Sequence, residues 1–281
     1  MAVRIVTDST ADLPQKFADD LGISVVPLSV IFGDEVFREG IDISHDLFYD
    51  KMARGRVMPT TSAPSVGEFL EAYEPLLKES NEIVSLHLSS KLSATYNNAV
   101  QAAQILADRG ARIEVIDTRV VSLGMTFVVL AAARAASEGS DIDQIKAVVE
   151  RTIGRIRIYF LLDTLEYLRR GGRIGRGRAF LGAMLRVKPL LSLRDGEVHP
   201  EERLRTKAHA MERLYQIATS YHNVQEVALG YSTNPQDAHE LKVRLAAALP
   251  RANILVTRVG PVIGAHSGPG VLGMGLLEGE E

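Results

Sequence analysis

Short apolar runs alternate with amphipathic stretches along the first half of the chain. The apolar runs are rich in Val and Ile, which is typical of buried strands, and the stretches between them have helical spacing. One helix is expected to begin at Ser65, because the Ser65 and Glu68 side chains can form a reciprocal capping box. Strands that alternate with helices predict an N-terminal α/β domain with a parallel sheet. Its expected strands are 3–7, 24–30, 83–88 and 112–116.

The pattern changes after Ile153, where β-rich runs follow one another more closely. Two of these runs flank Asp195-Gly196, a dipeptide that tolerates the positive φ angles of a tight hairpin, so antiparallel pairing is expected. We therefore predict two α/β domains, residues 1–155 with a parallel sheet and residues 156–281 with a mixed or antiparallel sheet. The elements expected in the second domain are strands at 157–162, 188–194, 197–203, 253–263 and 271–277, helices at 165–170, 207–221 and 235–249, and a Gly- and Arg-rich loop at 171–178.

Composition excludes several classes of function. The 281 residues carry a formal net charge of −3, which gives no general attraction to nucleic acid. The chain has no Cys, so disulfides, thiolate nucleophiles and Cys-ligated zinc are absent, and a reducing cytoplasm is the expected location. The seven His are scattered without a metal-binding spacing, so neither a metal nor a cofactor is expected.

Targeting and membrane signals are not expected either. The first residues read as a strand rather than as a signal peptide. The most apolar helix, expected at 125–136, is interrupted by Arg134 and is far shorter than the ~20 apolar residues of a membrane span. We therefore expect a soluble protein without integral membrane association.

Two hydroxyl-rich segments precede predicted helices. Residues 59–65 read Pro-Thr-Thr-Ser-Ala-Pro-Ser, and residues 89–96 read Ser-Ser-Lys-Leu-Ser-Ala-Thr-Tyr after a predicted strand. Helix N-termini attract anions, and open α/β sheets bind ligands beyond the carboxyl ends of their strands, so the two segments together fit a carboxylate. For either segment considered alone, ordinary helix capping is an alternative explanation of its hydroxyl groups.

A single histidine, His266, is expected in a small-residue loop at 264–270 between two strands. It can donate to an anion or serve a purely structural role. An alternative is a Ser/His acyl hydrolase or thioesterase that uses Ser93 or Ser62 as nucleophile, His266 as base and Asp8 as acid. No Gly-x-Ser-x-Gly motif surrounds either serine, which favours binding over hydrolysis. A DNA-associated regulator is disfavoured by the net charge and by the lack of a convincing helix-turn-helix.

Four separated motifs and one histidine resemble the DegV family. The motifs are Thr-Asp-Ser-Thr-Ala-Asp-Leu at 7–13, Thr-Thr-Ser-Ala-Pro-Ser at 60–65, Ser-Ser-x-Leu-Ser-x-Thr-Tyr at 89–96 and Leu-Arg-Arg-Gly-Gly-Arg-Ile at 168–174. The resemblance implies a two-domain protein that holds one long-chain fatty acid in a tunnel at the domain interface. It also implies a subunit that presents the carboxylate to a separate ATP-dependent kinase subunit, which makes acyl phosphate, and that does no chemistry itself.

The same resemblance suggests which residues meet the carboxylate. Thr61, Ser62 and Ser93 correspond to the hydroxyl donors, His266 to the imidazole partner and Arg170 to an arginine near this network.

One departure is Ala94, which stands where the family usually has Gly, so the backbone beside Ser93 has less freedom. The basic run of Arg203, Arg205 and Lys207 resembles the surface that meets the kinase subunit, although a solvated strand end explains it equally well.

Overall fold

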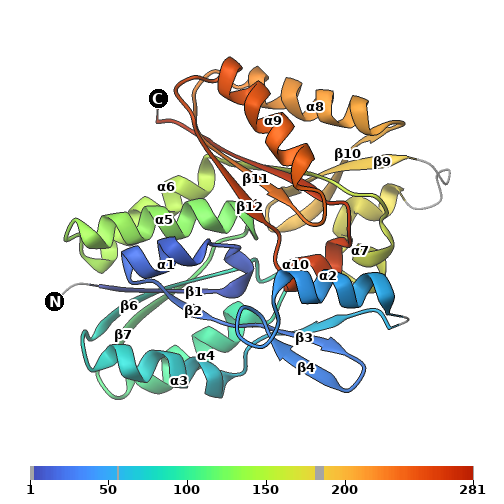
Figure 1. Cartoon of the computed structure of the whole chain (residues 1–281). Coiled ribbons are helices and arrows are strands. Elements are labelled where there is room, and N and C mark those ends of the chain that lie inside the picture. The colour runs from blue at the N-terminus through green and yellow to red at the C-terminus, as the bar shows by residue number, and fades with distance from the viewer. Residues whose placement is uncertain (1–2, 56, 181–186, 281) are drawn as a thin grey trace.

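The computed structural model describes residues 3–55, 57–180 and 187–280. The first half contains a four-stranded sheet in which every neighbouring pair is parallel, in the order β2-β1-β6-β7, as the alternating pattern predicts. Helices α3 and α4 cover one face, and α1, α5 and α6 cover the other (Figure 1). The Ser65–Glu68 capping box at the start of α3 is confirmed. The bounds are β1 (Arg4–Asp8), β2 (Ser24–Val26), β6 (Glu82–His87), β7 (Arg112–Asp117), α1 (Gln15–Leu21), α3 (Val66–Leu77), α4 (Thr95–Ala107), α5 (Leu123–Ser137) and α6 (Ile142–Gly154).

A small antiparallel sheet, not anticipated from the sequence, lies beside the parallel one. It consists of β4 (Glu35–Arg38), β3 (Ser29–Phe32) and β5 (Thr60–Ser62) in that order, and α2 (His45–Arg54) packs on it. The single strand expected at 24–30 is therefore wrong. Pro27 separates β2 from β3, because proline has no N–H to donate to a ladder. Residues 60–62, expected as a loop, form β5 and pair with β3.

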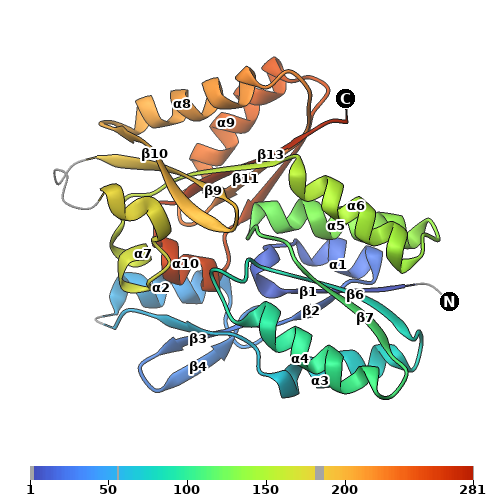
Figure 2. The ribbon, with the colours of Figure 1, turned by 180° about the vertical axis from the view of Figure 1, so that it is seen from behind.

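The second half is built on a six-stranded mixed sheet in the order β10-β9-β8-β13-β11-β12. Only β11 and β12 are parallel among its paired strands, so the predicted α/β fold class with a mixed C-terminal sheet is confirmed. Asp195 and Gly196 have φ angles of 49° and 79°, as the expected hairpin requires. Helices α8 and α9 cover its outer face (Figure 2). The bounds are β8 (Ile156–Leu161), β9 (Lys188–Arg194), β10 (Glu197–Leu204), β11 (Val224–Tyr231), β12 (Asn253–Arg258), β13 (Leu272–Glu278), α8 (Lys207–Ser220) and α9 (Pro235–Ala248).

Three short helical segments belong to the second half of the chain. They are α7 (Glu166–Arg170), the 3-10 segment η2 (Gly175–Phe180), which overlaps the loop expected at 171–178, and α10 (Pro261–Ser267). The strand expected at 253–263 is too long, because β12 ends at Arg258 and a helix begins at Pro261, the position where proline suits a first helical turn. His266 therefore lies on a helix and not in a loop.

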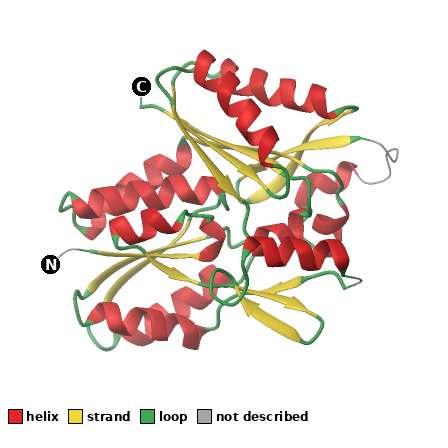
Figure 3. Ribbon diagram, in the orientation of Figure 1, coloured by secondary structure: helices red, strands yellow, loops and turns green. Residues whose placement is uncertain are grey.

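The largest apolar cluster spans both halves. It lies between α5 and the inner face of the C-terminal sheet, and it includes Phe127 and Val128 from one side and Ile158 and Leu193 from the other. Figure 3 shows the resulting layers, with helices on both faces of the N-terminal sheet and on the outer face of the C-terminal sheet. The division at residues 155 and 156 stays a prediction.

Candidate functional site

A cavity of about 460 Å³ lies between the two halves, within the usual size range of small-molecule sites. Its inner wall is apolar and comes from elements far apart in sequence. Ile158 on β8, Leu193 on β9, Val198 on β10 and Leu123 at the start of α5 all line it, and each is less than 9% exposed. No charged side chain lies among these inner residues, so this end can accommodate a hydrocarbon chain.

Five exposed or partly exposed polar lining residues form what we call the mouth of the cavity: Thr61, Ser62, Ser93, Arg173 and His266. Two further polar lining residues, Ser122 and Ser267, are buried. Thr61 Oγ1 lies 2.8 Å from His266 Nε2, and the His266 ring packs against Gly171. The Arg173 guanidinium donates to the Gly171 and Leu92 carbonyl oxygens, which brings it beside Ser93. The cavity therefore has an exposed polar mouth and a buried apolar interior.

His266 is neutral at physiological pH. Burial, followed by the positive charge of Arg173, lowers the pKa of His266 to about 4. Its Nδ1 is buried and has no hydrogen-bond partner among the described residues. Because a buried N–H without an acceptor is rarer than an unused acceptor, the ring proton belongs on Nε2, which then donates to Thr61 Oγ1. This arrangement leaves the Thr61 hydroxyl hydrogen free to point into the cavity.

Ser93 lies just before α4, the second expected hydroxyl-rich helix start. Its Oγ is 2.9 Å from Thr95 Oγ1 and accepts from the Thr95 N–H. The N-cap residue is Ala94, whose side chain cannot accept from the first free N–H groups of the helix. Its φ of −76° is ordinary, so alanine fits here without strain where the family usually has glycine. Ser62, also on the cavity wall, donates to the Ala63 carbonyl oxygen.

Two arginines of the motif at 168–174, Arg170 and Arg173, lie in different surroundings. Arg170 pairs with Glu166 at 2.5 Å, its side chain is 57% exposed, and it is not among the cavity-lining residues. Arg173, three positions later, lines the cavity mouth. The structure thus brings Thr61, Ser62, Ser93 and His266 to one cavity and leaves Arg170 outside it. Arg173 is part of the motif at 168–174, but the spacing of that motif does not distinguish the arginine that lines the cavity from the two that do not.

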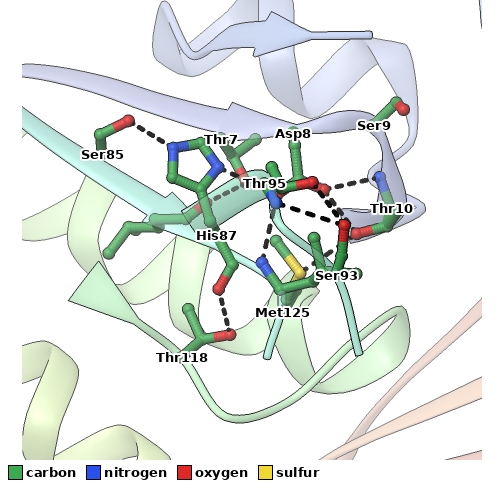
Figure 4. A network of polar contacts seen from close by, with 12 residues as sticks. Thr7, Asp8, Ser9, Thr10, Ser85, His87, Ser93, Thr95, Thr118 and Met125 are labelled. Carbon is green, nitrogen blue, oxygen red and sulfur yellow. Dashed lines mark hydrogen bonds and ion pairs between the residues drawn. The ribbon is translucent and has the colours of Figure 1, made fainter. Parts of the chain in front are cut away.

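A buried polar network lies at the carboxyl ends of β1 and β6 (Figure 4). His87 Nδ1 is 2.9 Å from Asp8 Oδ2, and His87 Nε2 is 2.7 Å from Ser85 Oγ. Asp8 also accepts from the Leu88 and Thr10 N–H groups. Asp8 is therefore committed to His87 rather than to His266. Among the described residues the hydrolase arrangement of Ser93, His266 and Asp8 is not assembled.

The expected partner-facing residues lie on the surface. Arg203, Arg205 and Lys207 are exposed, and Lys207 pairs with Asp237 at 2.5 Å. The Arg203 guanidinium lies 4.6 Å from the Phe180 ring centroid and donates to the Ala179 carbonyl oxygen. Arg203 is thus tied to η2, the segment that follows Arg173.

Neither a membrane-spanning helix nor a metal-binding cluster is found in the parts of the chain that the structure describes. Within residues 3–55, 57–180 and 187–280, no helix combines the length and the apolar character that crossing a membrane requires. Over the same ranges, no group of three or more His, Asp or Glu side chains is placed to hold a metal ion.

Comparison with known proteins gives consistent results. A family model described as "Uncharacterised protein, DegV family" matches residues 2–279. A DegV domain-containing protein of Streptomyces coelicolor is 40% identical over 97% of both chains, and the protein DegV of Bacillus subtilis is 33% identical over 98% of both.

Solved structures match over nearly the whole chain. A Thermus thermophilus DegV family protein described for its fatty acid binding has a TM-score of 0.91 and 35% identity, covering 99% of this chain and 100% of that one. The structure of Bacillus subtilis DegV, described as a fatty acid binding protein, has a TM-score of 0.91 and 31% identity with the same coverage. A stearic acid-binding protein of Eubacterium ventriosum matches with a TM-score of 0.91 and 25% identity over 98% of each chain.

Proposed function

Because the chain belongs to the DegV family, we propose that it holds one long-chain fatty acid in the cavity between its two halves. We further propose that it presents the carboxylate to a separate ATP-dependent kinase subunit and does no chemistry on the ligand itself, as a cytoplasmic carrier without a cofactor. The observation that carries this proposal is the polarity of the cavity, which has a buried apolar interior and hydroxyl, imidazole and guanidinium groups at an exposed mouth.

The apolar interior supplies most of the affinity in this proposal. Burying ~15 methylenes at ~0.8 kcal/mol each contributes roughly 12 kcal/mol before ordering costs are subtracted. Such a gain needs no specific hydrogen bond. The tail therefore retains the ligand, and the mouth determines which end of the ligand faces the solvent.

The mouth binds the carboxylate mainly through neutral donors. The Thr61 hydroxyl, fixed by His266 Nε2, donates from one side, and the Ser93 hydroxyl with the first turn of α4 donates from the other. Neutral donors and a helix N-terminus let the carboxylate stay ionised without a buried cation against it. Arg173 stands at the edge, where its charge keeps a direct path to solvent. Ser62 is a further donor once it leaves the Ala63 carbonyl, and Arg170 would have to leave Glu166 to join.

The basic strip of Arg203, Arg205 and Lys207 is the proposed contact for the kinase subunit. Arg203 contacts Ala179 and Phe180 of η2, the segment that follows Arg173 in the chain, and this link between the strip and the motif supports the proposal. Positive charge at such a surface accelerates encounter with an acidic partner.

Native mass spectrometry of the purified protein, followed by denaturation and lipid identification, tests the carrier proposal. One fatty acid per chain is the expected result. A measured mass that equals that of the protein alone, and does not change after incubation with fatty acids, would overturn the carrier proposal. Ester turnover by the isolated protein that disappears in Ser93→Ala would instead establish the hydrolase alternative.

Ser93→Ala separates presentation from retention. We expect fatty acid retention close to that of the unchanged protein and a larger loss in kinase-coupled acyl phosphate formation, trapped as hydroxamate. Thr60→Val is the matched control, because Thr60 is exposed on β5 and does not line the cavity. Loss of retention alone would contradict the assigned role of the mouth.

A further inference from the structure

Two buried carboxyl groups meet at the start of α10, the helix that carries His266. Asp12 follows the 3-10 turn η1 (Ser9–Ala11), and Glu39 follows β4, so both belong to the N-terminal half. Asp12 Oδ1 accepts from the Gly260 N–H at 2.9 Å, and Glu39 Oε1 accepts from the Val262 N–H at 2.8 Å. The side chains thereby satisfy backbone donors just before and within the first turn of α10, which otherwise lack intrahelical partners.

Gly260 allows both carboxyl groups to approach the same point. A Cβ atom at Gly260 would lie 2.5 Å from Glu39 Oε1 and 2.7 Å from Asp12 Oδ1. Its φ of −69° is ordinary, so the need for glycine here is steric and not conformational. The two carboxyl groups and α10 therefore form one closely packed joint.

The joint connects opposite walls of the cavity. Asp12 Oδ2 accepts from the Ser122 hydroxyl, and Ser122 lines the cavity on the side of α5. Ser122 has φ 53° and ψ −124°, a conformation that costs energy for a non-glycine residue and persists only where neighbours enforce it. On the other wall, α10 contributes Val262, Ile263 and His266. Asp12 thus connects Ser122, on one wall, to Gly260, the N-cap of the helix that carries the residues of the other wall.

The charge of the joint changes near neutral pH. Burial raises the pKa of Asp12 to about 7, and burial and then the negative charge of Asp12 raise the pKa of Glu39 to about 8. The second oxygen of Glu39, Oε2, is buried without a hydrogen-bond partner among the described residues. Ionising both groups places two negative charges side by side out of water, which is strongly unfavourable.

No positive charge in contact with the pair offsets this repulsion among the described neighbours. Tyr49 packs against α10 and donates its hydroxyl to the Val259 carbonyl oxygen. Arg258 lies over the Tyr49 ring and pairs with Asp46 at 2.5 Å. Asp8 adds a further negative charge that raises the pKa of both carboxyl groups. The joint is therefore tightest while the Asp12–Glu39 pair carries at most one negative charge.

We propose that Asp12 and Glu39 are positioning residues that hold α10, and with it His266, against the head group, and that ionising both of them loosens this hold and speeds ligand release. This inference rests on the proposed function, because it concerns the regulation of the same cavity. Release accelerates as pH rises through 7 to 9, since a group whose charged form is disfavoured in the closed structure favours opening at higher pH.

The test follows release of cis-parinaric acid, a fluorescent 18-carbon fatty acid, to phosphatidylcholine vesicles between pH 6 and 9. We expect the release rate of the unchanged protein to rise about tenfold, the factor that corresponds to one pKa unit. Glu39→Gln keeps a carbonyl oxygen for the Val262 N–H but cannot ionise, so its profile should be flat at the low-pH rate. Glu35→Gln is the control, because Glu35 is an exposed residue on β4. Any pH dependence that comes from titration of the fatty acid itself should remain in this variant.

Gly260→Ala provides a second, independent variant. Its methyl group separates the carboxyl groups from α10, so release should be fast at every pH, with circular dichroism confirming the fold. A Glu39→Gln profile that still rises with pH, or Gly260→Ala release equal to that of the unchanged protein, would overturn the inference alone. Failure of the unchanged protein to bind cis-parinaric acid would overturn the proposed function itself, so the two failures are distinguishable.

Discussion

Replacing Thr61 with valine tests the polar mouth, because valine keeps the shape of threonine and removes its hydroxyl. Thr61 Oγ1 is 2.8 Å from His266 Nε2, and Nδ1 of the same ring already lacks a partner among the described residues. Thr61→Val therefore leaves the whole imidazole without a hydrogen bond from the protein. An unsatisfied buried polar group costs about 1–3 kcal/mol, and His266 is half-buried, so we expect the lower part of this range.

Calorimetry of the delipidated protein measures the effect. At ~3 °C per kcal/mol for a chain of this size, Tm should fall by roughly 3–6 °C. Fatty acid affinity, measured by titration calorimetry, should fall by no more than about tenfold, because one hydrogen bond contributes ~1 kcal/mol. Thr60→Val, on the same strand but exposed, should change neither quantity. An unchanged Tm for Thr61→Val, or an equal loss for Thr60→Val, would refute the assigned Thr61–His266 contact.

Three further predictions concern the ligand, pH and packing. Shortening the ligand from 16 to 12 carbons removes four methylenes at ~0.8 kcal/mol each, so Kd should rise by up to about 200-fold; equal affinities would contradict a tail-dominated site. The pKa of His266 is about 4 in the folded chain and higher in the unfolded chain, so the stability this residue contributes is present above pH 6.5 and lost towards pH 4. The free energy of unfolding, measured by urea titration relative to His266→Asn, should fall by up to about 3 kcal/mol across that range, and a constant difference would argue against burial of a neutral ring. Gly171→Ala places a Cβ 2.3 Å from His266 Nδ1 and should weaken fatty acid binding in the same titration, whereas Gly67→Ala, whose Cβ meets nothing closer than 3.8 Å, should bind normally.

The parallel sheet, the capping box and the Asp195-Gly196 hairpin are confirmed. They could be predicted because each is indicated by a pattern of residues that are close together in the sequence. The strand expected at 253–263 failed for the opposite reason. Val262 and Ile263 favour a strand by propensity, but the burial of Val262 and Ala265 against α2 and β3 stabilises a helix instead. The sequence around residues 253–263 does not indicate that this segment packs on α2 and β3, which lie far away in the chain.

Some residues of the site could be predicted from the sequence and others could not. Thr61, Ser62, Ser93 and His266 lie on one cavity, as the resemblance implied, while their contact with a ligand stays a prediction. Asp12 belongs to the motif at 7–13, but the burial of Asp12 and Glu39 could not be predicted, because an acidic residue in a loop is normally solvated. Their burial depends on residues more than two hundred positions later in the chain.

The position of α10 also constrains how the chain is made. Phe48 and Tyr49 are covered by Val262 and Ala265, and the Tyr49 hydroxyl bonds a carbonyl 210 residues further on. At ~5–20 residues per second, a ribosome needs about 10–40 s to add the residues that close this cluster. During synthesis the small antiparallel sheet thus exposes aromatic surface to chaperones and to neighbouring nascent chains. A fragment ending near residue 155 would keep that surface permanently and should aggregate.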